Sequence, residues 1–346
     1  MTPALVIDRP GLLTSVQDFG RVGYQSSGVP VSGALDPVAM RLANFLVGNR
    51  EDEAVIEVLV QGPAMTVDAG SVRIALAGGG AGIELLGDGG VTVPTLTSVR
   101  LERGRSFRVT PLAGSNVACL AVEGGLAIDP VMGSRSTFMR GGFGGFAGRA
   151  LMPGDRLPLS SATAEPRAER SLRYDLPRPD RIRVVAGPQD DAFTREGMEA
   201  FLSSPFIISP ASDRMGLRLD GPPLAHRKSA DIVSDGMAPG SVQVPASGQP
   251  IVLLADRGTT GGYTKIATVI SADLPAIARR RVGETVRFES VSRETAVAAR
   301  RELEAELARV VASAMTLPEG GGIPTQDTLL SLYTANLVSG VVDAQE

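Results

Sequence analysis

Histidine and cysteine are almost absent from this sequence, and their scarcity excludes several kinds of active site. The chain has one histidine and one cysteine among 346 residues. A disulfide bond within the chain is therefore impossible, and a zinc site built from cysteine and histidine is unsupported. We predict that Cys119, in the apolar run VACLAV, is a buried strand thiol. His226, in the charged stretch PPLAHRKSAD, is predicted to be a solvated loop residue.

Clusters of basic residues and long apolar runs are also missing. The formal net charge is −4, and lysine and arginine are dispersed along the chain. Binding to nucleic acid or to a membrane surface therefore has no electrostatic support, and we expect neither partner. No run approaches the roughly 18 apolar residues of a membrane span, and the N-terminus lacks the pattern of a signal peptide. These absences predict a cytoplasmic location.

The common catalytic motifs are absent as well. The sequence contains no GxxxxGK[ST] loop, no HExxH motif and no GxSxG elbow. A Walker-type nucleotide site and a zinc-protease site are thereby excluded, and a Ser-His-Asp triad would have to use His226 without its usual elbow. No Met-Lys-Met triplet of the kind that carries biotin occurs, so the chain is not its own carboxyl carrier. We expect no metal and no tightly bound cofactor.

Glycine and proline, by contrast, are abundant, with 41 and 24 residues, while aromatic residues make up 4% of the chain. This mixture favours many turns and short strands over long helices. Runs rich in valine and isoleucine, bounded by glycine, proline, aspartate or serine, recur along the chain, for example at 4–8, 55–60, 117–122, 250–256 and 285–291. We predict a mainly β fold of two barrel-like or sandwich-like lobes with few short helices.

Three segments have the pattern of helices, at 36–49, 191–202 and 293–314. The first has Asp36 as a helix cap, Pro37 at the first position and Gly48 as a terminator. The stretch 161–180 mixes proline, arginine and glutamate without periodicity, which is typical of a linker. We therefore divide the chain into a first lobe at 1–160, a linker at 161–180, a second lobe at 181–292, a helix at 293–315 and a mobile tail at 316–346, with a possible short helix at 327–338.

Two glycine-rich stretches could present backbone N–H groups to an anion. They are AGGGAGIELLG at 77–87 and RGGFGGFAGRA at 140–150, and the second is flanked by Arg140 and Arg149. Neither is a dinucleotide fingerprint. Mobile surface turns explain the second stretch as well as anion binding does, and they explain the first stretch better.

Four polar stretches, at 14–36, 212–221, 234–250 and 255–273, carry more charged and hydroxyl side chains than turns require. The fourth contains ADRGTTGGYTKI, a tight corner between two apolar runs. In it we assign Lys265 and Arg257 to anion or carbonyl stabilisation, and Tyr263 or Asp256 to proton transfer. The candidates for substrate binding are Arg214, Arg218, Gln243, Thr259, Thr260, Gly261, Gly262, Gln17 and Arg21. The alternative is that the arginines and aspartates pair with one another and only hold loops in place.

These stretches resemble the allophanate hydrolase subunit 2 family, also called the biotin-dependent carboxyltransferase family. The resemblance rests on GLLTSVQDFGRVGYQSSGVPVSGALDPVAMRLANFLVGN, GGFGGFAGRALMPGDRL, SDRMGLRLDG and MAPGSVQVPASGQPIVLLADRGTTGGYTKIATVISADL, and covers about 1–290. Thr264 departs from the pattern, which has proline there. The tail beyond about 315 has no counterpart.

The resemblance implies two cyclophilin-like β-barrel domains and a heteromeric complex. It implies the role of the C subunit in an ATP-dependent 5-oxoprolinase, which opens 5-oxoproline to glutamate together with a B and an A subunit. The B subunit would be similar to allophanate hydrolase subunit 1. The substrate would be a small amide or carboxylate, with ATP used by the complex. An alternative is a carboxyltransferase that moves carboxylate from carboxybiotin, carried on another chain, to a urea-like or amide acceptor. A second alternative is a non-catalytic regulatory binding protein.

Overall fold

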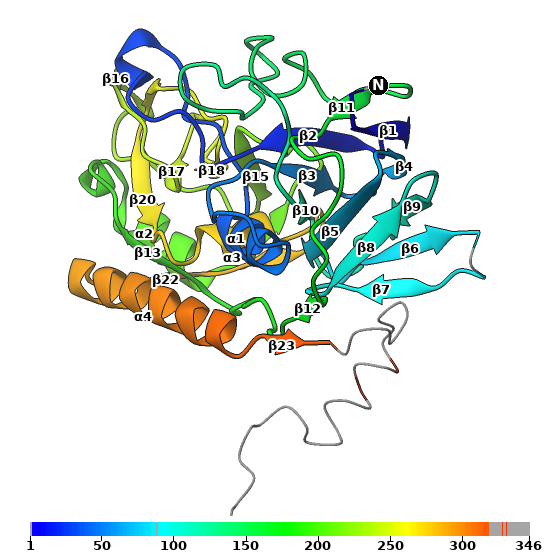
Figure 1. The fold of residues 1–346 in the computed structure, drawn as a ribbon. Coiled ribbons are helices and arrows are strands. Elements are labelled where there is room, and N and C mark those ends of the chain that lie inside the picture. The colour runs from blue at the N-terminus through cyan, green and yellow to red at the C-terminus, as the bar shows by residue number, and fades with distance from the viewer. Residues whose placement is uncertain (1, 88, 318–326, 328–329, 331–346) are drawn as a thin grey trace, which may run out of the picture.

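The computed structural model describes residues 2–87, 89–317, 327 and 330 of the chain (Figure 1). Most of the regular structure consists of short strands, and the described part contains four α-helices. The prediction of a mainly β fold with few helices is confirmed. None of these helices combines the length and the apolar character needed to cross a bilayer.

Two sheets form the first half of the chain and enclose one apolar core. The six-stranded sheet has the order β11-β1-β4-β9-β6-β7, and the five-stranded sheet has the order β2-β3-β10-β5-β8. The strands are β1 (Ala4–Arg9), β2 (Leu13–Gln17), β3 (Val55–Leu59), β4 (Ala64–Asp68), β5 (Ser71–Gly78), β6 (Gly82–Leu86), β7 (Thr92–Pro94), β8 (Ser98–Glu102), β9 (Ser106–Val109), β10 (Val117–Val122) and β11 (Arg156–Pro158).

Strand β10 is the central strand of the five-stranded sheet. All six of its residues are buried, because one face packs into the core of the first half and the other lies under helix α1 (Pro37–Leu46). Cys119 is fully buried in this strand, as predicted, and burial raises the pKa of its thiol well above the ordinary value. Its cross-strand partner is Glu57 of β3, a carboxylate on a buried strand.

The second half contains an eight-stranded sheet that nearly closes into a barrel. Its order is β21-β14-β15-β18-β17-β20-β13-β22. We predicted one strand over 285–291, but this strand is interrupted at Arg287. The two parts, β21 and β22, pair with opposite edges of the sheet. This break brings the two edges together. The strands are β13 (Ile182–Ala186), β14 (Phe206–Ile208), β15 (Gly216–Asp220), β17 (Ser241–Gln243), β18 (Ile251–Leu253), β20 (Lys265–Val269), β21 (Thr285–Val286) and β22 (Phe288–Ser290).

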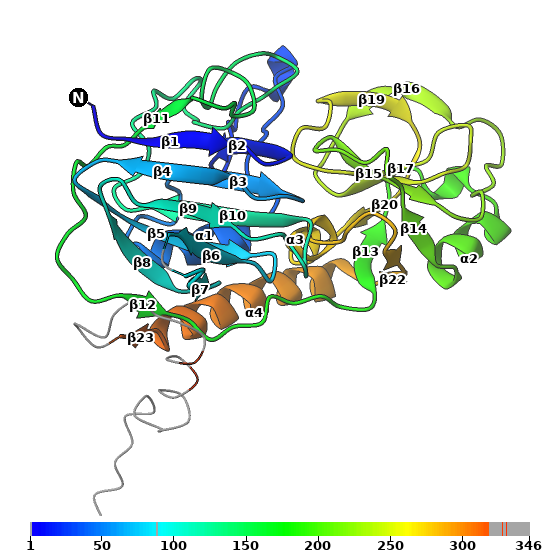
Figure 2. The same ribbon diagram turned by 90° about the vertical axis from the view of Figure 1, so that its right-hand side faces the viewer.

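A separate two-stranded ribbon lies beside this barrel. It is formed by β16 (Asp231–Gly236) and β19 (Thr260–Tyr263), which pair in antiparallel fashion. Figure 2 shows the ribbon along the outer side of the second half, next to β15 and β17. Five of the six residues of β16 are exposed, so the ribbon contributes little to the core.

Local sequence signals explain the helices. The Asp36 carboxylate accepts a hydrogen bond from Ala39 N at 3.0 Å, Pro37 is the first residue of α1, and Gly48 follows its end with a φ of 77°. The other helices are α2 (Arg195–Ser203), α3 (Leu274–Ala278) and α4 (Arg293–Ala312), with short 3-10 turns η1 (Gln25–Ser27) and η2 (Asp190–Ala192). Helix α4 runs beneath both halves of the chain (Figure 2) and packs against β13 and α1.

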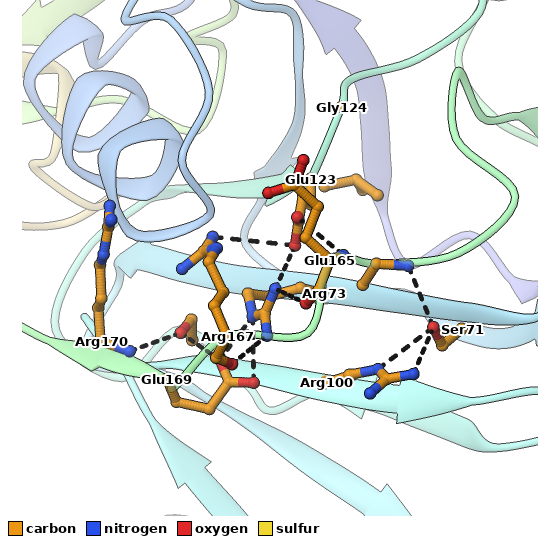
Figure 3. A network of polar contacts seen from close by, with 12 residues as sticks. Ser71, Arg73, Arg100, Glu123, Gly124, Glu165, Arg167, Glu169 and Arg170 are labelled. Carbon is orange, nitrogen blue, oxygen red and sulfur yellow. Dashed lines mark hydrogen bonds and ion pairs between the residues drawn. The ribbon is translucent and has the colours of Figure 1, made fainter. Parts of the chain in front are cut away.

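The segment predicted as a linker is packed against the first half. The guanidinium of Arg73, on β5, is fully buried and contacts the carboxylates of Glu123 and Glu169 at 2.5 and 3.0 Å (Figure 3). It also donates to the carbonyls of Glu165 and Arg167. Arg73 therefore holds residues 165–169 in place.

The linker also pairs with the chain beyond α4. Strand β12 (Arg170–Ser171) pairs with β23 (Met315–Thr316), and Leu317 is buried. The first residues of the segment predicted as a tail are thus part of the fold. From 318 onwards that segment lies outside the described residues, apart from 327 and 330.

His226 differs from the prediction of a solvated loop residue. Its imidazole is half-buried, with ring centroid 4.6 Å from that of Phe193 and Nε2 2.9 Å from Thr264 Oγ1. Burial lowers the pKa of His226 below the ordinary value. Thr264, which stands where the resemblance has proline, provides the hydroxyl for this contact, and a proline could not provide it.

Candidate functional site

Two of the predicted site residues belong to a buried ion-pair group that joins the two halves of the chain. Arg214 Nε donates to Asp256 Oδ2 at 2.9 Å, and the same guanidinium contacts Glu57 on β3. Its Nη2 also donates to the carbonyl of Gly33 at 2.7 Å. We call Arg214, Asp256 and Glu57 the interlobe clamp. Glu57 and Gly33 belong to the first half, whereas Arg214 and Asp256 belong to the second.

The clamp is almost completely shielded from solvent. The exposed fractions of the side chains are 3% for Arg214, 1% for Glu57 and 7% for Asp256. Burial alone lowers the pKa of Arg214, but the two carboxylates outweigh it and hold the pKa above the ordinary value. Arg214 therefore remains charged and occupied, which makes it a structural contact rather than a free substrate donor.

Arg257 follows the clamp directly and has a different environment. Only 6% of the residue is exposed, yet its described hydrogen bonds go to two backbone carbonyls, those of Met237 at 3.0 Å and Leu254 at 3.3 Å. Burial lowers the pKa of Arg257. Arg257 lines a cavity of about 450 Å³ between the two halves, which we call the interlobe cavity.

Gln243 and Lys265 are brought together on neighbouring strands. They are cross-strand partners of β17 and β20, so their side chains leave the same face of the sheet. Lys265 is 2% exposed and its ammonium lies 3.1 Å from Asp235 Oδ2 on the ribbon. The Gln243 amide contacts the sulfur of Met237 at 3.4 Å. Segment 235–237 therefore meets Lys265, Gln243 and Arg257.

The ribbon covers this face through residues of the predicted corner. A Cβ at Gly261 would lie 2.6 Å from the Gln243 amide nitrogen and 2.8 Å from the sulfur of Met237. Any larger residue at this position would displace the ends of the Gln243 and Met237 side chains. Tyr263, by contrast, is 41% exposed, and Thr260 and Gly262 lie on the same outer strand, with Thr259 directly before it. The corner thus combines a buried half with an open half.

The remaining candidates lie apart from this cluster. Arg218 is exposed on β15. Gln17 and Arg21 are buried in the first half, where Gln17 Nε2 donates to the Thr137 carbonyl at 3.2 Å and Arg21 lies 5.0 Å above the Phe143 ring. Burial lowers the pKa of Arg21. Gln17 Oε1 and two guanidinium nitrogens of Arg21 have no hydrogen-bond partner among the described residues.

Sequence reasoning missed three residues of the site. Glu57 interrupts the apolar run VIEVLV, and a lone carboxylate in a buried strand was a signal that it needs a buried cation. Asp235 and Met237 lie in a stretch that we had singled out, but nothing in the sequence distinguished them from their neighbours. Their importance follows from the position of the ribbon.

The arrangement offers fixed cations and amide donors rather than a metal centre. In the described part of the chain, no group of three or more histidine, cysteine, aspartate or glutamate side chains is placed to hold a metal ion. Arg257, Lys265 and Gln243 can donate hydrogen bonds to a carboxylate or polarise a carbonyl in a shielded environment. This chemistry suits a small substrate with an amide or carboxylate group.

Comparison with known proteins gives a family for this geometry. Residues 27–290 match the model described as "Carboxyltransferase domain, subdomain A and B". The chain is 39% identical over 302 residues to the 5-oxoprolinase C subunit of Escherichia coli K12, covering 86% of this chain and 94% of that protein. It is 33% identical over 316 residues to urea amidolyase of Saccharomyces cerevisiae, covering 84% of this chain but 17% of that protein.

Solved structures give the same relationship. Urea amidolyase of Kluyveromyces lactis superimposes with a TM-score of 0.81 at 26% identity over 90% of this chain, which spans 20% of that longer chain. The crystal structure of TTHA0988 superimposes with a TM-score of 0.74 at 36% identity. The match covers 84% of this chain and 56% of the TTHA0988 chain. The 5-oxoprolinase and urea amidolyase relatives are an enzyme subunit and a larger enzyme, respectively. The chain belongs to the family of carboxyltransferase domains that comprise subdomains A and B.

Proposed function

We propose that this chain is the C subunit of an ATP-dependent 5-oxoprolinase complex, which opens 5-oxoproline to glutamate together with its B and A subunits. The observation that carries the proposal is the similarity to the 5-oxoprolinase C subunit over 94% of that protein. The two proteins have matching extents, whereas the chain corresponds to only 17% of the yeast urea amidolyase.

The buried cations suit this reaction. 5-Oxoproline carries a carboxylate and a lactam, and opening the lactam requires a polarised amide carbonyl. Arg257 and Lys265 provide positive charge in a shielded place, and Gln243 provides an amide that can both donate and accept. ATP would be bound elsewhere in the complex. We place the complex in the cytoplasm, as expected from the sequence.

Asp256 and Tyr263 remain the proposed residues for proton transfer, and their environments differ. Both carboxylate oxygens of Asp256 lie within hydrogen-bonding distance of Arg214, at 2.9 and 3.3 Å. Tyr263 is exposed on the ribbon and accessible to a partner chain. We therefore favour Tyr263, which can act without opening the interlobe clamp.

The test is reconstitution of the complex. The chain is co-purified with its presumed B and A partners, and glutamate release from 5-oxoproline is measured with and without ATP. We expect ATP-dependent release that is lost on Arg257→Ala or Lys265→Ala, with circular dichroism showing an unchanged fold. Absence of turnover by an assembled wild-type complex would refute the proposal, and near-normal rates of both variants would remove these residues from the site.

A second candidate is favoured by the family match and by the urea amidolyase relatives. In this alternative the chain moves carboxylate from carboxybiotin, carried on another chain, to a urea-like or amide acceptor, with Tyr263 and Lys265 facing the ureido ring. Incubation with a biotinylated carrier that has been charged with labelled bicarbonate distinguishes the two. Transfer of label to urea-like acceptors supports the carboxyltransferase, and retention of all label on the carrier excludes it.

A further inference from the structure

The interlobe cavity is bounded by segments that are far apart in the sequence. One wall comes from the first half, with Phe19, Val31, Ser32 and Leu35, and the opposite wall comes from the second half, with Pro239, Leu253, Leu254, Arg257 and Leu274. Its volume of about 450 Å³ lies within the range of small-molecule sites. Most of the lining is apolar, so the polar groups that line it determine what it can bind.

Arg257 is the first of these polar groups. Five arginines of the described chain are buried, and they are Arg21, Arg73, Arg214, Arg257 and Arg279. Arg73, Arg214 and Arg279 each pair with at least one carboxylate. Arg21 and Arg257 have no carboxylate partner among the described residues, but Arg21 lies against the Phe143 ring and is not part of the cavity lining. Arg257 does line the cavity, and within the described residues only two backbone carbonyls accept its hydrogen bonds. A buried guanidinium without a counter-ion requires an anion to compensate it.

Ser32 is the second polar group and belongs to the opposite wall. The residue is 6% exposed, and its Oγ has no hydrogen-bond partner among the described residues. Its φ of 56° is in the left-handed region, which is uncommon for serine and is found at ligand sites and tight turns. Buried hydroxyls without a partner are rare in folded proteins. A bound ligand with an acceptor oxygen would supply the missing partner.

The interlobe clamp fixes the two polar groups relative to each other. Arg214 is bonded to the carbonyl of Gly33, next to Ser32, and to Asp256, next to Arg257. Backbone bonds from Arg21 N to the Val31 carbonyl and from Ala34 N to the Asp18 carbonyl, both 2.8 Å, hold the first wall. The polar groups are therefore presented by rigid walls, as in a preformed binding site.

We propose that the interlobe cavity is a binding site for a small carboxylate with a compact apolar ring, with Arg257 and Ser32 as ligands of the carboxylate and with the ring against Leu35 and Leu254. The identity of the ligand as 5-oxoproline rests on the proposed function, whereas the carboxylate site rests on the lining of the cavity. Arg300, whose side chain is 44% exposed and pairs with Glu304, lies at the same cavity and adds positive charge.

Binding to the isolated full chain tests this assignment without partners or ATP. The probes are 5-oxoproline, cyclopentanecarboxylate and the neutral lactam 2-pyrrolidinone, and binding is followed by ligand-observed NMR and calorimetry. Charge-assisted hydrogen bonds predict that both carboxylates bind about ten- to a hundredfold more tightly than the neutral lactam. Equal binding of charged and neutral probes, or no binding of either carboxylate, would overturn the proposal.

Variants locate the site within the chain. Arg257→Gln is expected to weaken carboxylate binding by about tenfold or more, and Ser32→Ala by several-fold, with little effect on the neutral lactam. Arg301→Gln removes the same charge from an exposed position of α4 and is expected to bind like the wild type. Unchanged carboxylate binding by both cavity variants would overturn the proposal. If Arg257→Gln fails to fold, Ser32→Ala decides whether the carboxylate binds in this cavity.

The two proposals can fail separately. A complex that turns over 5-oxoproline while Arg257→Gln binds the carboxylates normally would leave the proposed function intact and overturn the cavity assignment. If the isolated chain binds carboxylates through Arg257 but the assembled complex never releases glutamate, the cavity assignment stands and the proposed function is refuted.

Discussion

Replacing Arg214 by methionine removes the cation that neutralises two buried carboxylates. The side chains of Glu57 and Asp256 are 1% and 7% exposed, so neither can be solvated without opening the contact between the two halves. Removing one partner of a buried ion pair costs about 3–5 kcal/mol, because an uncompensated charge is left in the interior. We expect a loss of this size in the free energy of unfolding.

The loss is measured by urea unfolding, followed by far-UV circular dichroism and by the fluorescence of the four tyrosines, since the chain has no tryptophan. Arg218→Met serves as the matched control, because Arg218 is exposed on β15, and its effect is expected to stay within about 0.5 kcal/mol.

A triple variant separates charge from packing. Arg214→Met combined with Glu57→Gln and Asp256→Asn leaves no charge in the interlobe clamp, and the glutamine can still accept the hydrogen bond from Leu35 N that Glu57 accepts. It is expected to recover most of the stability that the single variant loses. A single variant that loses less than about 1 kcal/mol, or a triple variant as unstable as the single one, would refute this account of the interlobe clamp.

Three further predictions follow from other buried or half-buried groups. Arg73→Met is expected to lower the free energy of unfolding by about 3 kcal/mol and to speed hydrogen exchange at 165–171, whereas unchanged exchange there would contradict the role of Arg73. The lowered pKa of His226 means that the folded state binds fewer protons than the unfolded state, so stability should rise with pH between that lowered pKa and the ordinary value of about 6.5. The chain has one histidine, so a single imidazole NMR titration measures this pKa. A midpoint at or above the ordinary value would contradict the prediction. Lys265→Met is expected to speed exchange in the ribbon but not in β10, with little change in global stability because Asp235 is 55% exposed.

Local signals in the sequence were sufficient for several elements. Asp36, Pro37 and Gly48 mark the ends of α1 by capping and φ preferences that act within a few residues. The apolar run at 117–122 gave a buried strand, and Cys119 lies in it as a buried thiol. These features depend on neighbours along the chain and need no tertiary information.

The break at Arg287 could not be predicted in this way. An alternating run at 285–291 has the pattern of one strand, but closing the barrel divides it between two edges of the same sheet. His226 was misjudged for a similar reason, because its partners Phe193 and Thr264 are brought to it by folding. In both cases the deciding contact is distant in sequence.

The candidate site shows the same division. Arg257, Lys265 and Gln243 were identified by residue type and by their density around a glycine corner, and the structure places them around segment 235–237. The sequence could not show that Arg214 and Asp256 are occupied by each other, nor that Glu57, 157 residues from Arg214, completes their group.

The sequence by itself determined the β-rich composition, the helix ends, the family resemblance and the types of side chain available for chemistry. Only the tertiary structure decided which charges neutralise one another and which are left to meet a ligand. The physical reason is that the free energy of a buried charge depends on its solvation and its nearest counter-ion. Arg214 and Arg257 have the same chemistry and nearly equal burial, but folding gives carboxylate partners to the first and, in the described chain, only backbone carbonyls and an open cavity to the second.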